Sequence, residues 1–307
     1  MMTRRDFLKG FLAAGAAWAL PGGIFVRRLT GASYINSHRG MGPLDPEVIV
    51  WRDRVIAAGG GFESNSISIA QNLITQLKAS TFNQNILYLL PLLGTGINAA
   101  RVPLRDTLNV GAASNNSFLD VQFSQSTGLE YDGGPRLFDT GIKPNQLGTD
   151  PSFPTAGGMG HWELNFTNAA AGVEYMGCYN IAGDQRFCID LRNTIRGFQW
   201  GSPGNGAYGS GTASNKLYYG QRPVSVLRQA FEGDAPPINE NLTTDTASGV
   251  ADRTIWCFAC NSNLGAARFP TGRSGVQFLT DGVLNDFEVT DLHTLLRDYL
   301  MVPTGRV

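Results

Sequence analysis

Apolar residues change their spacing along this chain near residue 100. Before that point they recur every three or four positions, as at Val48, Trp51 and Val55, which is the period of an amphipathic helix. Beyond it, apolar and polar residues alternate, as at residues 162–166, which is the period of a half-buried strand. The pattern therefore predicts helices first and a β-rich region behind them.

Two helices are predicted before residue 80. The segment 45–47 (Asp-Pro-Glu) supplies an N-cap, a first-turn proline and a first-turn acid, and the glycines at 59–61 end this helix. A second helix begins at Ser64 or Ser66 and buries one face. That face consists of Ile67, Ala70, Ile74 and Leu77.

Short alternating runs fill most of the chain between residues 100 and 280. They lie at residues 119–123, 162–166, 173–179, 187–191 and 255–259. Clusters of Gly, Asn, Asp and Pro separate the runs, and no helical pattern intervenes, which favours a sandwich or barrel over a parallel α/β sheet. A last amphipathic helix begins at Asn285 with Glu288 as a capping box. We therefore expect a mainly β fold with two N-terminal helices and one C-terminal amphipathic helix.

The N-terminus has the layout of an export signal. Arg4 and Arg5 precede Phe7 and Leu8, an alanine-rich stretch follows, and Pro21 ends it. This segment resembles the twin-arginine pattern at every position, and that pattern is an address read by a receptor and not an anchor. The alternative is an ordinary basic amphipathic helix.

We therefore expect the twin-arginine export machinery to be a partner, with a periplasmic, cell-surface or secreted location. The predicted division is a signal peptide at 1–22, a linker at 23–44 and one domain at 45–307.

Composition and charge narrow the class of protein. Charged residues make up 16% of the 307 residues, and 38 residues are glycine, which favours a fold with many tight turns. A formal net charge of -1 gives no electrostatic case for binding nucleic acid. Because no apolar run approaches the roughly 20 residues of a membrane span, none is expected in the mature chain.

Four cysteines leave several alternatives open. Cys178 and Cys188 lie symmetrically about Gly183 in a predicted hairpin and could form a cross-strand disulfide. Cys257 and Cys260 have redox or zinc spacing, although residues three apart on a strand point to opposite faces. The twin-arginine route carries folded cargo, so the domain should not depend on disulfides as folding staples. Buried thiols are the main expectation, with a Cys178–Cys188 disulfide or a four-cysteine zinc site as alternatives.

Candidate catalytic groups are sparse, and no catalytic residue is predicted. Glu130 and Asp132 could flank a glycosidic bond as acid and nucleophile about 5 Å apart, but a glycine turn follows them directly. Acids at the end of a strand beside a turn are the simpler interpretation. Only His38, His161 and His293 could serve a triad, and no Gly-x-Ser-x-Gly elbow accompanies them.

Three blocks of sequence, in order, carry a family resemblance. They are WRDRVIAAGG at 51–60, AARVPL at 99–104 with the strand region 118–144, and LYYGQR at 217–222 with the closing segment 278–300. Together they resemble the concanavalin A-like lectin/glucanase (laminin G-like) jelly rolls of exported bacterial and phage-associated proteins. The resemblance implies an antiparallel jelly-roll β-sandwich.

Sugar recognition on such a fold requires exposed aromatic faces beside hydrogen-bonding groups. Trp200, Asn205 and Tyr208 lie in or beside a turn-rich loop, and strand alternation predicts that either Tyr218 or Tyr219 points outward. We therefore expect Trp200, Asn205, Tyr208 and Tyr219 to contribute to a ligand-binding surface.

The first functional hypothesis is an exported, non-catalytic protein that recognises glycans at the cell envelope or outside the cell. The alternatives are a structural or assembly component resembling phage tail or surface proteins, and a divergent glycan-cleaving enzyme. No cofactor is expected, except that fold analogy alone would allow calcium at Asp132 or Asp281.

Overall fold

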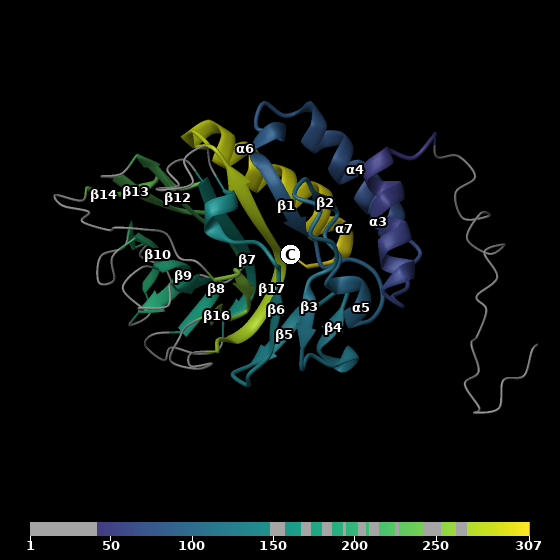
Figure 1. The fold of residues 1–307 in the computed structure, drawn as a ribbon. Coiled ribbons are helices and arrows are strands. Elements are labelled where there is room, and N and C mark those ends of the chain that lie inside the picture. Colours follow the sequence, from purple (N-terminus) through teal and green to yellow (C-terminus); the bar gives the residue numbers. More distant parts are fainter. Residues whose placement is uncertain are drawn as a thin grey trace, which may run out of the picture. The chain divides into compact units, whose positions relative to one another are not determined.

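The computed structural model describes residues 42–147, 157–166, 173–179, 186–192, 195–201, 207–208, 215–224, 227–241, 253–261 and 269–306. Residues 43–307 form one compact unit (Figure 1). Within the described ranges, no helix is long and apolar enough to cross a membrane.

Two sheets make up the β-rich part of the described chain. The first, here called the helix-side sheet, has nine strands in the order β14-β13-β12-β7-β17-β1-β2, with β5 beside β17 and β4 beside β5. Its strands are β1 (Ile86–Leu90), β2 (Arg105–Asp106), β4 (Phe123–Ser124), β5 (Gly128–Asp132), β7 (Gly157–Phe166), β12 (Lys216–Val224), β13 (Leu227–Glu232), β14 (Ile238–Asn241) and β17 (Thr271–Asp281).

The second, here called the far sheet, has eight strands among the described residues, in the order β11-β10-β9-β8-β15-β6-β3, with β16 beside β8. Its strands are β3 (Ser114–Asn116), β6 (Leu137–Asp139), β8 (Val173–Tyr179), β9 (Arg186–Arg192), β10 (Ile195–Gly201), β11 (Ala207–Tyr208), β15 (Trp256–Cys257) and β16 (Cys260–Asn261). Strand pairing is antiparallel throughout these described strands, apart from β16 with β8. The predicted antiparallel β-sandwich is confirmed.

The helices begin where local capping residues predict. In α3 (Pro46–Ala57), the Asp45 carboxylate accepts a hydrogen bond from the Glu47 amide at 2.9 Å. In α6 (Asp286–Leu296), Asn285 and Glu288 form the reciprocal capping box. The helix α4 (Ser66–Ala79) instead has Asn65 at its N-cap position, one residue from each predicted cap.

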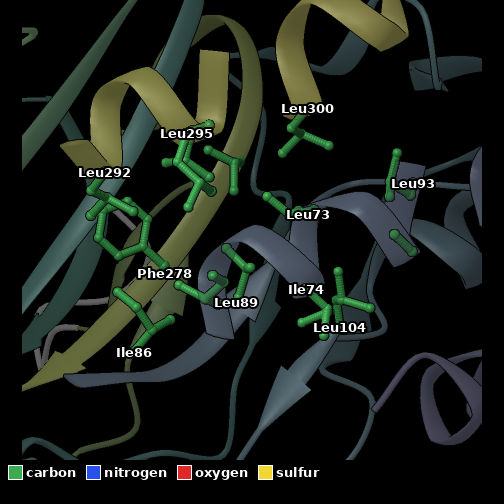
Figure 2. Packing of buried hydrophobic residues seen from close by; sticks show 14 of the residues in the cluster. Leu73, Ile74, Ile86, Leu89, Leu93, Leu104, Phe278, Leu292, Leu295 and Leu300 are labelled. Atoms are coloured by element: carbon green, nitrogen blue, oxygen red, sulfur yellow. The ribbon is translucent and has the colours of Figure 1, made fainter. Parts of the chain in front are cut away.

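One core lies between the helices and the helix-side sheet. Figure 2 shows α4 and α6 directing leucine and isoleucine side chains onto Phe278 of β17 and Leu89 of β1. Gly160 of β7 faces the Phe278 ring at van der Waals range or closer, so any side chain there would displace the ring. This close approach explains a glycine in the middle of a central strand.

A second core lies between the two sheets. Along β7, Met159 packs into this core while Trp162 packs against the helices, as the two-residue period of a strand requires. The far sheet contributes aromatic and aliphatic side chains, among them Phe138, Phe187 and Phe198. The helix-side sheet is therefore buried on both faces.

The alternating run at 119–123 does not form the predicted strand, and only Phe123 belongs to one. Asp120–Gln122 is a 3₁₀ turn in which Leu119 is 58% and Val121 is 88% exposed. The Asp120 carboxylate accepts a hydrogen bond from the Ile97 amide at 2.7 Å, at the start of the short helix α5 (Ile97–Ala100). The Gln122 side chain accepts another from the Leu119 amide. One of these bonds is local and the other reaches α5, and together they outweigh the apolar alternation.

Candidate functional site

Two of the predicted ligand-binding residues, Trp200 and Tyr208, lie on neighbouring strands of the far sheet. Trp200 of β10 pairs with Phe187 of β9, and Tyr208 of β11 pairs with Gly197 of β10. Since β11 is the last strand in the order of this sheet, Trp200 and Tyr208 lie on neighbouring strands at its edge. Their side chains lie outside what the structure describes, and Asn205 lies outside the described residues altogether.

The prediction for Tyr219 is wrong. Both Tyr218 and Tyr219 are buried, and Tyr219 is only 1% exposed in the core beneath the helices. The Tyr219 ring stacks on Phe278 at a centroid distance of 5.8 Å, and its hydroxyl donates to Gln221 Oε1 at 3.0 Å. The strand alternates as predicted, but helices cover the face that was expected to meet solvent. Tyr219 therefore cannot stack on a sugar.

The alternative of a Cys178–Cys188 disulfide is also wrong. Strand β9 pairs with β8 so that Cys178 lies opposite Phe187, while Cys188 lies opposite Gly177. Cys178 consequently packs between the sheets, and Cys188 packs on the outer face of the far sheet. A side chain on each face of one sheet cannot form a disulfide. The main expectation of buried thiols is confirmed for all four cysteines.

The same division excludes a four-cysteine zinc site. Cys257 lies in the core between the sheets, where burial raises the pKa of its thiol well above the ordinary value. Cys260 lies on the outer face with Cys188 and Tyr179. Phe258 between the two cysteines has a φ of 68°, so the chain leaves the extended conformation here. The four thiols thus form an inner set and an outer set.

The two acids of β5 do not form a catalytic pair. Glu130 binds the Arg273 guanidinium at 2.8 Å, and Asp132 forms an ion pair with Arg136. The hydrogen bond from Arg136 lowers the pKa of Asp132, which keeps that carboxyl ionised. A glycosidase acid requires the opposite, a carboxyl whose pKa is raised.

One group of side chains resembles part of a hydrolase triad but is sealed inside the sandwich. Ser274 Oγ lies 3.1 Å from His161 Nδ1, and Glu163 lies two residues along the same strand face. All three side chains are 0% exposed, and the Ser274 hydroxyl also donates to the Trp162 carbonyl oxygen at 3.2 Å. A nucleophile in this position cannot meet a substrate.

The other two histidines, His293 and His38, do not belong to this buried group. His293 of α6 stacks on Trp162 with ring centroids 5.0 Å apart and an interplanar angle of 5°. Burial lowers the pKa of His293 below its ordinary value of 6.5, so the ring packs as a neutral aromatic group near pH 7. His38 lies outside the described residues.

Sequence reasoning did not find a polar side chain enclosed between the sheets. Gln277 of β17 is fully buried, and neither polar atom of its amide has a hydrogen-bond partner among the described residues. Its register partner on β7 is His161. No local signal marks Gln277, because in the sequence it reads as the polar half of an ordinary alternating strand.

The calcium suggestion finds no support in the geometry. Asp132 is occupied by Arg136, and Asp281 ends β17 at a turn where its carbonyl oxygen accepts from Asn85. Across the described ranges, no group of three or more His, Cys, Asp or Glu side chains could hold a metal ion.

Residues 1–21 match the model of the twin-arginine translocation pathway signal sequence. The chain therefore carries this signal and is exported across the membrane, as predicted. No curated protein matches the chain.

Among solved structures, the chain is similar to the CBM40 of Ruminococcus gnavus IT-sialidase, with 14% identity and a TM-score of 0.41 over 54% of this chain and 96% of that one. It is similar to domain 4 of AbnA, a GH43 extracellular arabinanase from Geobacillus stearothermophilus, with 11% identity and a TM-score of 0.44 over 68% and 98%. A mutant Trypanosoma rangeli sialidase matches with 10% identity and a TM-score of 0.44 over 70% and 33%. Likenesses this loose transfer no ligand and no activity.

Proposed function

We propose that this chain is an exported, non-catalytic protein that binds glycans through the β10–β11 edge of its far sheet. We also propose that it belongs with the concanavalin A-like jelly rolls that its sequence blocks resemble. The observation that carries the binding proposal is the position of Tyr208 on β11, the last strand in the order of the far sheet. Trp200 lies on the neighbouring strand β10, three positions along from Gly197, the register partner of Tyr208. Aromatic residues beside a turn-rich loop suit stacking on pyranose rings.

The covering of the helix-side sheet supports this choice of surface. Helices pack on one face of that sheet and the far sheet packs on the other, so both faces are filled by side chains. A lectin-like surface on the outer face of this sheet would form only if the helices did not pack on that face. The edge of the far sheet, where Trp200 and Tyr208 lie on neighbouring strands, remains as the candidate surface.

The ion pairs of the acidic groups on β5 support glycan binding without cleavage of a glycosidic bond. Glu130 and Asp132 each face an arginine of their own, and the pKa of Asp132 is lowered. Hydrolysis of a glycosidic bond needs one protonated carboxyl as acid and a second carboxylate about 5 Å away. The ion pairs at β5 favour the ionised form of both carboxyl groups, so neither is suited to act as the protonated acid.

A glycan array probed with the chain lacking residues 1–21 tests the proposal. We expect binding to a restricted set of glycans, and Trp200→Ala should weaken it by at least about fivefold, since one aromatic stack contributes about 1 kcal/mol. Isothermal titration with the best glycan then gives the affinity of each variant. Tyr208→Ala should act in the same direction.

Two variants serve as controls. Tyr219→Phe removes a hydroxyl in the helix-side core, and Phe287→Ala removes an exposed ring from α6; both should bind as the unaltered chain does. Equal binding by Trp200→Ala would overturn the proposed surface. Concentration-dependent assembly without sugar binding would favour the structural alternative, and release of reducing sugar that Glu130→Gln abolishes would establish an enzyme.

A further inference from the structure

An exposed asparagine followed by a serine lies at one end of the far sheet. Asn116 is the last residue of β3, and β3 stands at the opposite end of the strand order from β11. We propose that Asn116 is a site of spontaneous deamidation, at which the folded chain converts this asparagine into aspartate and isoaspartate. This inference goes beyond the glycan-binding proposal and is independent of it.

The reaction joins the asparagine side chain to the backbone amide that follows it. The Ser117 nitrogen attacks Cγ of Asn116 and forms a new C–N bond. The bond between Cγ and Nδ2 breaks, and the proton lost by the Ser117 amide leaves with Nδ2 as ammonia. Water then opens the cyclic succinimide at either carbonyl carbon, which gives aspartate or isoaspartate. The reaction therefore needs only water and an amide that can reach Cγ.

The Ser117 side chain is placed to assist this attack. Its Oγ donates a hydrogen bond to Asn116 Oδ1 at 3.1 Å. Negative charge develops on this oxygen when the amide nitrogen adds to Cγ, and a hydroxyl already directed at the oxygen stabilises that charge. Both residues are exposed, so water can reach them for the second step.

The backbone leaves the strand at the attacking residue. The register of β3 with β6 covers residues 114–116 and does not include Ser117. Ser117 has a φ of 70°, which lies in the left-handed region that few residues other than glycine adopt. Because the Ser117 amide stands outside the β3–β6 pairing, it can turn toward the Asn116 side chain without breaking that pairing.

The preceding asparagine has the opposite arrangement. Asn115 Oδ1 accepts a hydrogen bond from the Phe118 amide at 3.1 Å, and Asn115 Nδ2 donates to the Phe118 carbonyl oxygen at 3.0 Å. These two bonds hold the Asn115 side chain at both ends, and the amide that follows it belongs to β3. We therefore expect Asn115 to stay unmodified.

A second Asn-Ser pair separates the effect of structure from that of sequence. Asn65 also precedes a serine, but Ser66 is 0% exposed, and its amide donates to the Glu63 carbonyl oxygen at 3.1 Å where α4 begins. The Asn65 side chain is held too, since its Oδ1 accepts from Gln125 Nε2 at 2.6 Å. Attack by the Ser66 amide therefore requires local opening of the helix end.

Isoaspartate at position 116 would disturb the anchor of a core aromatic residue. The two bonds between Asn115 and Phe118 close a short loop that contains residues 116 and 117. Isoaspartate adds one carbon atom to the backbone inside this loop. Phe118 is 3% exposed, and its ring packs edge to face on Phe138 at a centroid distance of 5.1 Å. The modified chain should therefore melt at a lower temperature than the unmodified chain.

Mass spectrometry of the full chain after incubation in mildly alkaline buffer tests the site. Peptide mapping follows the mass change from amide to acid at each asparagine, and electron-transfer fragmentation separates aspartate from isoaspartate. In the folded chain, Asn116 should convert at least about tenfold faster than Asn65, because only Asn65 needs local opening. In concentrated urea, where neither pair is structured, the two should convert at similar rates.

Two variants assign the reaction to these side chains. Ser117→Ala removes the hydroxyl donor and should slow the folded conversion of Asn116 by at least about threefold, with a smaller effect in urea. Asn116→Gln, whose longer side chain closes the ring poorly, should show no conversion at this position and a constant melting temperature during incubation. Thermal melts check that both variants are folded.

The comparison of the two Asn-Ser pairs needs no variant and can contradict the proposal directly. Equal rates at Asn116 and Asn65 in the folded chain would overturn it, as would an intact Asn116 after Asn65 has reacted. A folded rate that Ser117→Ala leaves unchanged would overturn the role of the hydroxyl.

Discussion

The two sheets of this sandwich differ in what covers them. The helix-side sheet packs against helices on one face and against the far sheet on the other, so its central strands are buried on both sides. The far sheet shares only the core between the sheets with that layer, and on its outer face the described residues form the small cluster around Cys188. In Figure 1, the helices lie over β1 and β17, away from β8, β9 and β10.

This difference decides which residues can meet a ligand. In the helix-side sheet, aromatic side chains such as Tyr219 and Trp162 serve packing, because both faces are closed. In the far sheet, residues at the edge and on the outer face are not committed to the helices. Under the proposed function, the helix-side sheet contributes packing and the edge of the far sheet contributes the binding surface.

The largest effect is expected where helices and sheet meet. Phe278→Ala removes a 0% exposed ring that stacks on Tyr219 and should lower the free energy of unfolding by about 3–5 kcal/mol. Phe287→Ala is the matched control, since that ring is 84% exposed and its loss should change stability by less than about 0.5 kcal/mol. Urea unfolding measures both. Equal effects would mean that the helices do not seal this sheet.

A smaller loss is expected at Arg306, which ties together strands and loops of the helix-side sheet. Its buried guanidinium donates to the carbonyl oxygens of Pro91 at 3.1 Å, Gly275 at 2.6 Å and Gln125 at 2.7 Å, and also to that of Leu92. Burial lowers the pKa of Arg306 to about 9.

Arg306→Met leaves these carbonyl oxygens without their donor and should reduce the free energy of unfolding by about 2–3 kcal/mol. Thermal and urea unfolding should agree on the loss. Arg306→Lys, which keeps one charged donor, should recover part of it. A methionine variant as stable as the unaltered chain would show that the guanidinium is dispensable.

The smallest effect concerns alkaline pH. Burial raises the pKa of Tyr219 above its ordinary value of 10.0 and that of Cys257 above 9.0. The folded protein therefore holds these protons when the unfolded chain has released them. Stability is fully present below about pH 9 and declines as pH rises through the ordinary values.

Tyr219→Phe should make this decline shallower when unfolding is followed from about pH 8 to about pH 10.5. Arg306 acts in the opposite direction above about pH 9, because its folded pKa is lowered, but it is common to both proteins and cancels in the comparison. Parallel curves for the two proteins would contradict the burial of the Tyr219 hydroxyl.

Local chemistry was readable from the sequence, and this explains most of what was predicted correctly. Asp45 and the Asn285–Glu288 pair mark helix starts because a cap bonds to an amide two or three residues away. The strands at 162–166 and 187–191 follow from alternation. The run at 119–123 does not form the predicted strand, because Gln122 bonds locally in a turn and Asp120 bonds to the Ile97 amide 23 residues away.

The pairing of strands from distant segments could not be predicted from the sequence. Whether Cys178 or Cys260 accompanies Cys188 depends on a strand register, and a shift of one residue moves a side chain to the other face. The prediction for Tyr219 failed for a related reason. Alternation predicts the face of the sheet from which a side chain projects, but it does not predict whether another element covers that face.

The sequence by itself determined the export signal, the helix ends and the mainly β character of this protein. Each of these features depends on residues within a few positions of one another, because covalent spacing along the chain brings such residues together. Only the tertiary structure decided which sheet the helices cover, which aromatic residues are buried, and which cysteines share a face. Those outcomes depend on contacts between segments 50 or more residues apart, such as Cys188 with Cys260, and no local pattern encodes them.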